Sequence, residues 1–557
     1  MSSIRKRNWT SQNRLGPAPR QTELADGQIV LLGKLGLLSW GITLPGATIR
    51  GSQLAPARIA WGSVGFMTRW NVLGSVNRRV SILFTYGAAN AQPALTAAIL
   101  VMIYARAFSL ADFGVYGVLG AVFFVVSILI EMGASSAILR NFYDLNQDEI
   151  AGRNYLRSVI QGTRLVSIFT LPFIVAILYF SWPLLHIGND GRALFLVLIL
   201  FAAFFDRSCQ ILGTVCRALD RPGAFAAGRA VQAVATIAGA LALVTVFHFG
   251  LVGALAANLM GKFVSAVSYE LLLISSLGLR RPRLVWEDTN ACLVFGLPLV
   301  PNQLLAWGRF VALRPVLAHF VSLPMVGLFS LASALSALPT LLSQATDLAM
   351  SPLYFRRRAA GAAEFPDKAR KFATLFATGL FPVWVVCIVF SPILIRLYAG
   401  SRFVEAAPVC TVLFCAAYIR AQLQFLFRQV HFLRKTWILP LTMLPSAVVS
   451  LLLTGLWIHA AGILAAGWAV LISDTLLFLL LASAIQQHER LQFPVLTSLV
   501  MLGILTLLAF WVVLGEPAPR ALPKPLLQLA IALSSFLVSA RIWLWPERHF
   551  IYSLVTR

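Results

Sequence analysis

The feature that most constrains this chain is a succession of long apolar segments between residues 81 and 545. A helix of about 20 apolar residues crosses the roughly 30 Å hydrocarbon core of a bilayer. The segments are continuous, whereas the strands of a membrane barrel alternate between polar and apolar residues. The chain is 59% hydrophobic and only 12% charged, while soluble domains are about 45–50% apolar. These features predict an all-α, polytopic membrane protein.

We predict fourteen transmembrane helices, with both termini in the cytoplasm. The loops between them alternate in charge, and the basic loops are residues 140–158, 217–229, 279–283, 355–371 and 433–437. Because Lys and Arg collect in cytoplasmic loops, this side of the protein is predicted to be cytoplasmic. The predicted spans are residues 81–104, 115–138, 165–186, 193–215, 230–249, 251–278, 291–318, 322–350, 372–398, 404–429, 437–458, 462–484, 494–515 and 525–545.

The formal net charge of +24 has two explanations, nucleic-acid binding and the basic cytoplasmic loops of a membrane protein. We favour the second because the basic residues fall in every second loop, and we expect no nucleic-acid partner. The six cysteines lie in or beside apolar runs, without a CxxC pair or a Cys/His cluster. They are interpreted as small buried residues, so no metal site and no disulfide framework is expected.

Residues 1–80 differ from the rest of the chain, since they hold eleven basic residues, two acidic residues and no spanning run. They are interpreted as a basic N-terminal extension. The alternative is that translation starts at Met67, which stands shortly before the first hydrophobic helix. The first polar turn after that helix contains Ser109 and Asp112, whose spacing fits a capping box that starts the second helix. A plain solvated turn is the simpler alternative.

An internal repeat relates the two halves of the chain. The segment SLADFGVYGVLGAV (109–122) matches SLPMVGLFSLASAL (322–335) at an offset of 213 residues, and FGLVGALAANLMGK (249–262) matches AGILAAGWAVLISD (461–474) at 212. Asn90 and Asn302 correspond at the same offset of 212. Each unit holds six spans, so both copies insert with the same orientation. This predicts a parallel repeat, with the halves related by an axis along the membrane normal.

These motifs resemble a known family, the oligosaccharide-lipid (O-antigen and exopolysaccharide) flippases of the multidrug/oligosaccharidyl-lipid/polysaccharide flippase superfamily. The residues that carry the resemblance are ARAFSLADFGVYG, ALDRPG, FGLVGALAA and SLPMVGLFSLASAL, within roughly residues 81–490. The resemblance implies alternating access between two six-helix lobes around a central cavity, in the bacterial inner membrane. The N-lobe would be residues 81–286, the C-lobe 287–490, and helices thirteen and fourteen with a cytoplasmic tail 491–557.

Ionisable residues inside spans cost about 2.5–3.5 kcal/mol at the bilayer centre, so they usually face a wet cavity or a partner. Arg309 and Arg420 lie near mid-span, and each could line the cavity or form a structural pair. Arg314 lies five residues after Arg309, about 140° around the helix. Lys262 stands two turns before Glu270, and we predict that these two form an ion pair.

Three intramembrane acids, Glu131, Asp206 and Asp474, could carry a coupling H⁺ or Na⁺, whose gradient would then drive transport. Local neutralisation by Arg207 is the simpler account of Asp206. No other cofactor and no metal is expected.

The substrate implied by the resemblance is a polyprenyl-pyrophosphate glycolipid. We predict that Arg309, Arg420 and Arg314 bind its pyrophosphate, because guanidinium groups pair bidentately with phosphate oxygens and stay charged when desolvated. Its other expected partners are membrane lipids and the polysaccharide polymerase machinery. The alternatives are a multidrug exporter or a lipid II flippase of the same superfamily, and, in another class, a membrane polysaccharide polymerase or ligase. The sequence has no DxD, HExxH, Walker or GxSxG motif, so we do not expect an enzyme.

Overall fold

The computed structural model describes residues 64–145, 149–188, 191–277, 284–359, 365–433, 435, 437–488, 493–514, 531, 534 and 535. The chain divides into Met1–Leu73 and Gly74–Arg557, and the account below concerns the second part. The predicted N-terminal extension lies outside the described residues as far as residue 63. The fourteenth predicted span, residues 525–545, also lies outside them apart from three isolated residues.

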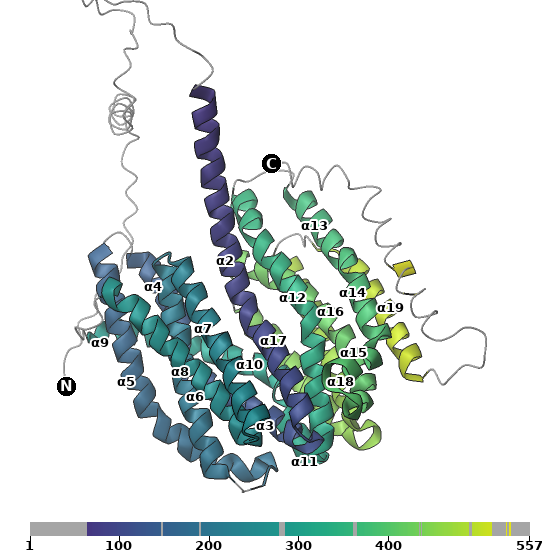
Figure 1. The fold of residues 1–557 in the computed structure, drawn as a ribbon. Coiled ribbons are helices and arrows are strands. Elements are labelled where there is room, and N and C mark those ends of the chain that lie inside the picture. The colour runs from purple at the N-terminus through teal and green to yellow at the C-terminus, as the bar shows by residue number, and fades with distance from the viewer. Residues whose placement is uncertain are drawn as a thin grey trace, which may run out of the picture. The chain divides into compact units, whose positions relative to one another are not determined.

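All secondary structure in the described part is helical (Figure 1). The first helices are α2 (Val64–Ala107), α3 (Leu110–Glu131), α4 (Ala134–Leu145), α5 (Glu149–Ser181), η2 (Trp182–Leu185), α6 (Arg192–Ala218), α7 (Pro222–Ala240), η3 (Leu241–Val246) and α8 (Gly250–Leu277). Span seven consists of α9 (Trp286–Gly296), η4 (Leu297–Leu299), α10 (Val300–Phe310) and α11 (Leu313–Phe320). The remaining helices are α12 (Leu323–Ala359), α13 (Phe365–Gly379), α14 (Phe381–Val389), α15 (Ser391–Ala399), η5 (Ser401–Ala406), α16 (Ala407–Leu433), α17 (Ile438–Ala461), α18 (Ile463–Gln486) and α19 (Val495–Leu514).

Twelve helical segments of the described part are long and apolar enough to cross a membrane. A thirteenth is counted if the pair Ala373–Val389 and Ser391–Ala399, bent by 71°, forms one span. These segments coincide with the first thirteen predicted spans, which confirms the prediction of a polytopic helical protein. Fourteen spans remain a prediction.

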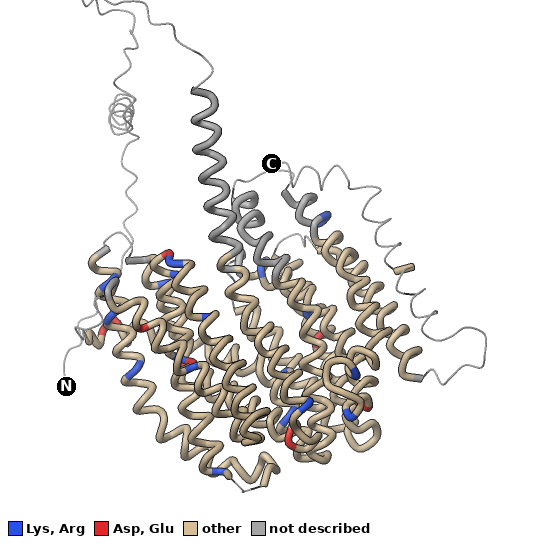
Figure 2. Tube along the Cα trace, in the orientation of Figure 1, with Lys and Arg blue, Asp and Glu red and all other residues tan. Residues whose placement is uncertain are grey.

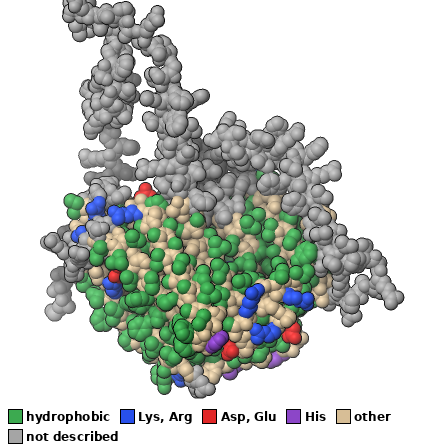
Figure 3. All heavy atoms as spheres, viewed as in Figure 1, with side chains coloured by type: hydrophobic (Ala, Val, Ile, Leu, Met, Phe, Trp, Pro, Cys, Tyr) green, Lys and Arg blue, Asp and Glu red, His purple; other side chains and the backbone are tan. Residues whose placement is uncertain are grey.

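The outer surface of the described helices is apolar, as a protein in lipid requires. On α5, for example, Phe169, Phe173 and Phe180 are 72%, 72% and 80% exposed, an arrangement that would favour aggregation in water. Hydrophobic side chains cover most of the face shown in Figure 3. Charged positions are sparse along the helices (Figure 2).

The helices form two groups, which we call the N-terminal half (α3–α8) and the C-terminal half (α12–α18). The closest packing joins α7 with α8, α17 with α18, and α16 with both α12 and α18. Span seven connects the halves, because α9 packs against α4 and α5 while α10 packs against α17. The halves also meet directly where α3 packs along α12.

Several spans are broken where the sequence requires it. Span seven breaks between α10 and α11, three to four residues before Pro315, because proline offers no N–H and its ring clashes with the carbonyl four residues earlier. Span two breaks at Gly133 (φ 69°), which approaches the backbone of Gly296. The predicted helix start is confirmed, since Ser109 is the N-cap of α3 and its Oγ accepts from Asp112 N at 3.1 Å.

Candidate functional site

Three predicted residues come together in the C-terminal half. Nη1 of Arg309, at the end of α10, donates to Oδ1 of Asp474 on α18. Nε of Arg420, on α16, lies 3.0 Å from Asp474 Oδ2, close enough for an ion pair but not aligned as a hydrogen bond. One carboxylate therefore faces two guanidinium groups, and these three side chains are only 11%, 2% and 19% exposed for Arg309, Asp474 and Arg420.

The carboxylate does not satisfy both guanidinium groups. Nε of Arg309 and both Nε and Nη2 of Arg420 are buried, and none of them has a hydrogen-bond partner within the described part of the chain. Buried donors are nearly always paired in native proteins, so unpaired ones call for an explanation. Three convergent cationic donors are what an anion would need at this place.

The ion pairs lie at the middle of their helices. Arg420 is the fourteenth of the 27 residues of α16, and Asp474 is the twelfth of the 24 residues of α18. Ser450, the thirteenth of 24 residues of α17, donates from Oγ to the carbonyl oxygen of Arg309 at 2.8 Å. The break in span seven frees this carbonyl from its helical partner, so α17 replaces the missing bond. Three helices thus place the cluster near the centre of the bilayer.

Arg314 joins this group through Phe310. The Phe310 ring centroid lies 4.3 Å from Cζ of Arg420 and 6.0 Å from Cζ of Arg314. Nη2 of Arg314 donates to Ser333 Oγ on α12 at 2.8 Å, so Arg314 and Arg309 face different helices, as their angular separation predicts. We call Arg309, Phe310, Arg314, Arg420 and Asp474 the arginine cluster. Its three cations and one carboxylate give these described residues a net charge of +2.

The exposure of Arg420 points to space inside the bundle. Its neighbours Ile419 and Ala421 are both 0% exposed, and α16 is surrounded by α12, α14, α18 and α19. A partly exposed guanidinium on such a central helix cannot owe its exposure to the lipid. It therefore adjoins an internal opening at the level of the cluster.

The ion pair of the N-terminal half is the counterpart of this arrangement. Nζ of Lys262, on α8, pairs with Oδ1 of Asp206 on α6. Lys262 corresponds to Asp474 at the repeat offset of 212, and Asp206 corresponds to Arg420 at 214, so the charges are reversed between the halves. The position that corresponds to Arg309 at 212 is Ala97. One acid and one base therefore cancel in each half, and the positive excess comes from span seven.

Two predictions about the N-terminal half are wrong. Lys262 does not pair with Glu270, which instead pairs with Arg164 of α5. Asp206 is not neutralised by the adjacent Arg207, because the pairing partner of Asp206 is Lys262. Helix geometry explains both results, since each of these side chains points toward a different neighbouring helix.

Glu131 has a local structural contact. Its Oε1 accepts from the backbone N of Ser135 at 2.7 Å and its Oε2 from that of Gly133 at 3.1 Å. These bonds satisfy backbone donors at the start of α4, as an N-terminal capping carboxylate does. Among the described residues, no group of three His, Cys, Asp or Glu side chains is arranged to hold a metal ion.

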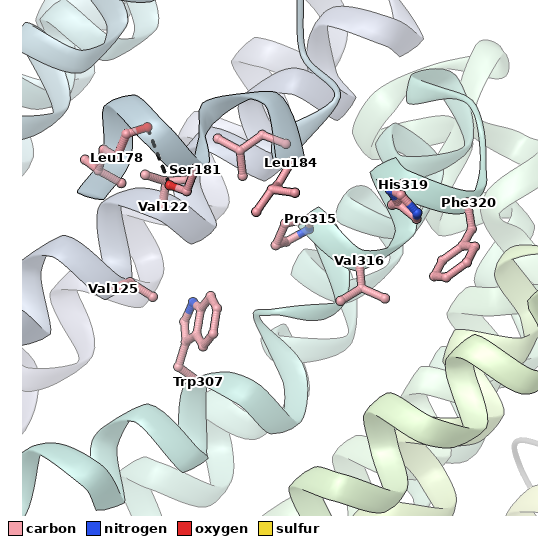
Figure 4. A pocket seen from close by; sticks show the side chains of 11 residues that line it. Val122, Val125, Leu178, Ser181, Leu184, Trp307, Pro315, Val316, His319 and Phe320 are labelled. Carbon is pink, nitrogen blue, oxygen red and sulfur yellow. Dashed lines mark hydrogen bonds between the residues drawn. The ribbon is translucent and has the colours of Figure 1, made fainter. Parts of the chain in front are cut away.

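A separate apolar pocket of about 430 Å³ lies between α3, η2 and span seven (Figure 4). Val122 and Val125 of α3 face Trp307 and Val316 across it, and His319 and Phe320 lie at the α11 side. None of the charged members of the arginine cluster lines this pocket. Its walls suit hydrocarbon and offer nothing that would recognise an anion, so the candidate functional site is the arginine cluster.

Comparison with known proteins agrees with this fold. A family described as "Polysaccharide biosynthesis protein" matches residues 103–408, which is more than half of the 557 residues. The chain belongs to this family. The resemblance predicted from the sequence is thereby confirmed, and the protein is a membrane transporter of polysaccharide biosynthesis. No curated protein matches the chain.

Solved structures with this fold include members of the same superfamily. The lipid II flippase MurJ, in an inward closed conformation, gives a TM-score of 0.63 at 16% identity, covering 84% of this chain and 100% of MurJ. An inward-facing multidrug resistance MATE transporter gives 0.54 at 15% identity, with 77% and 96% covered. The MATE transporter DinF-BH gives 0.51 at 19% identity, with 78% and 98% covered. At these identities the similarity establishes the fold that the family shares.

Three contributors to the site were not predicted from the family's sequence pattern. Phe310 is one of many aromatic residues in the spans, and Ser333 and Ser450 are among many serines. Only Phe310 had a local signal, its place directly after Arg309 and before a proline-induced break. Ser333 and Ser450 act through residues more than a hundred positions away or on another helix, which local patterns do not reveal.

Proposed function

We propose that the protein moves a polyprenyl-pyrophosphate-linked oligosaccharide, the repeat unit of an O-antigen, a capsule or an exopolysaccharide, across the bacterial inner membrane by alternating access. The observation that carries this proposal is the positive excess of the arginine cluster at mid-membrane. A buried charge of this kind is costly unless it is used. We propose that the pyrophosphate is what the cluster holds during the crossing.

The charges of the cluster and the ligand match. A pyrophosphate that links a lipid to a sugar has two ionised phosphate groups, and the described residues of the cluster carry a net charge of +2. The planar guanidinium fork binds phosphate oxygens bidentately and is more weakly hydrated than an ammonium group. The cluster would thus replace the hydration of the head group, while the polyprenyl chain stays in lipid.

Asp474 gives the empty site a counter-ion. Without ligand, its carboxylate compensates Arg309 and Arg420 in part and so lowers the cost of burying them. A phosphate would compete with it for the same donors. Asp474 is therefore the acid at which we propose that a coupling H⁺ acts, since protonation would free both arginines for the ligand.

We propose structural roles for the other two acids. Glu131 caps α4 and Asp206 pairs with Lys262. In the orientation given by the basic loops, the end of the bundle near α13 faces the cytoplasm and the end near α11 faces outward. Cytoplasmic substrate would enter from the α13 end, and the polymerase machinery would receive it beyond the α11 end.

The rival functions fit the cluster less well. A multidrug exporter that carries cationic compounds would need an excess of acids, whereas this cluster holds three bases and one acid. A lipid II flippase would share the pyrophosphate, so the cluster does not distinguish it from our proposal. The genetic experiment below does, because the two substrates feed different polymers.

The proposal is tested in a strain that lacks this protein. We expect loss of the surface polysaccharide and accumulation of its lipid-linked repeat unit in the cytoplasmic leaflet, with cell-wall synthesis intact. Complementation with Arg309→Ala or Arg420→Ala should fail, whereas Arg192→Ala, at an exposed arginine on α6, should restore the polymer. Unchanged surface polysaccharide in the deletion strain would reject the proposed substrate. Full restoration by Arg309→Ala would reject the arginine cluster as its site.

A further inference from the structure

At the α11 end, the two halves touch through a reciprocal pair of glycines. A Cβ added at Gly114 of α3 would lie 2.0 Å from the carbonyl oxygen of Leu323. A Cβ added at Gly327 of α12 would lie 2.2 Å from the carbonyl oxygen of Leu110. Both glycines and both leucines are related by the same offset of 213 residues. Each half thus presents an equivalent glycine to the backbone of the other.

One turn further along, the same crossing holds Arg314. A Cβ at Gly117 would lie 2.2 Å from Ser330 Oγ and 3.4 Å from Cδ of Arg314. Arg314 donates to Ser333 Oγ, and that hydroxyl donates in turn to the carbonyl oxygen of Ser330, at 2.8 Å each. The arginine is therefore enclosed between α3 and α12 only while these helices are together.

Further contacts at this end join the same two parts of the chain. Phe113 of α3 meets Phe403 of η5 edge-on, with ring centroids 5.4 Å apart. Nη2 of Arg106 donates to the carbonyl oxygen of Leu397 at 2.9 Å, and Nη2 of Arg402 donates to that of Arg106 at 3.0 Å. The two hydrogen bonds are exposed, so water can replace them at little cost.

We propose that the α3–α12 crossing closes the translocation path at the α11 end, and that Arg314 releases this closure when an anion occupies the arginine cluster. The coupling rests on the proposed function, whereas the closure does not. Phe310 contacts both Arg314 and Arg420, so the Arg314 guanidinium lies at the border between the crossing and the anion site. An anion that draws this guanidinium inward removes it from Ser333.

The nature of the contact makes it reversible. Close approach at small residues is held by van der Waals contact, without interdigitating side chains that would have to disengage. Ligand binding can shift such an equilibrium only if the ligand prefers one state. Arg314 supplies that preference, because it bonds α12 in the closed state and the anion in the open state.

The closure is tested by labelling Ser330→Cys with a membrane-impermeant maleimide applied from outside to cells with a permeabilised outer membrane. Ser330 is 5% exposed, so labelling should be slow. Adding Gly114→Val or Gly327→Val should raise it about tenfold, because a formerly minor open state becomes dominant. Gly120→Val is the matched control, since Gly120 is on the same helix and has no atom within 4 Å of its Cβ position.

The parent protein without Ser330→Cys reports any reaction of the six native cysteines. Size-exclusion chromatography of each variant separates opening from unfolding. If the valine variants fold and label no faster than the Gly120→Val protein, the closure is rejected. If either variant does not fold, the milder Gly114→Ala and Gly327→Ala proteins take its place, with a smaller rise expected and the same rejecting result.

The coupling is tested on purified protein in nanodiscs with inorganic pyrophosphate as the probe. Pyrophosphate binding is measured by calorimetry, and Ser330→Cys labelling is measured with a bulky maleimide. We expect pyrophosphate to bind and to accelerate labelling, and we expect Arg314→Gln to label quickly without it. Binding with no acceleration would reject the coupling and leave the proposed function intact. No binding at all would reject the proposed function and the coupling with it, while the result for the valine variants would still decide the closure.

Discussion

Asp474→Asn is the substitution with the most informative consequence for stability. The change removes the charge that compensates two guanidinium groups of which only 11% and 19% is exposed. Removing one partner of a buried ion pair typically costs about 3–5 kcal/mol, since the other charge stays buried and unpaired. Because both arginines keep some exposure, we expect the lower end, a loss of about 3 kcal/mol in the free energy of unfolding.

Reversible denaturant unfolding in detergent–lipid micelles measures this loss. Asp112→Asn is the control, because Asp112 is exposed and its replacement should change the free energy by less than about 0.5 kcal/mol. Pyrophosphate at a hundred times its dissociation constant stabilises a protein by about 2.7 kcal/mol. We expect a given concentration to stabilise the Asp474→Asn protein more than the wild type, because the competing carboxylate is gone. Equal stability of variant and wild type, or a smaller effect of pyrophosphate on the variant, would refute this reasoning.

Further predictions concern single contacts. Lys262→Met should lower the free energy of unfolding by about 3 kcal/mol, and a second change, Asp206→Leu, should recover most of it in the same assay. Arg420→Lys keeps the charge but loses the fork and the stacking on Phe310, so the transport rate should fall about tenfold; an unchanged rate in vesicles would show that charge alone suffices. Glu131→Gln should cost about 1 kcal/mol of stability through the weaker cap and leave the ion dependence of transport unchanged; a changed dependence would assign coupling to Glu131 instead.

The sequence predicts the helices well, because each span is a local run of apolar residues whose length the bilayer dictates. It also predicts the start of α3 at Ser109, since a cap needs only neighbouring residues. The break in span seven has a local cause in Pro315, although its position relative to the charges becomes meaningful only in the fold. Everything that depends on sequence-adjacent residues was therefore accessible to sequence reasoning.

Pairing between helices was not accessible in the same way. Mid-span position marks Arg309, Arg420 and Asp474 as candidates, but it does not show that they meet, because α10, α16 and α18 are brought together only by packing. The prediction for Lys262 failed for the same reason: proximity along one helix suggested Glu270, whereas the helix directs Lys262 toward Asp206 of α6. The repeat holds the missing information, since its offset relates the ion pairs of the two halves.

The most direct test of the account is transport by the purified protein. Proteoliposomes with a fluorescent polyprenyl-pyrophosphate oligosaccharide in one leaflet should show its transfer to the other leaflet, which a membrane-impermeant quencher reports. We predict transfer with the wild-type protein and, at equal protein content, at least tenfold slower transfer with Arg309→Ala, a loss equivalent to about 1.4 kcal/mol of binding to the crossing head group. Equal transfer by the two proteins, or no transfer by the wild type, would contradict the claim that the arginine cluster carries a pyrophosphate through the membrane.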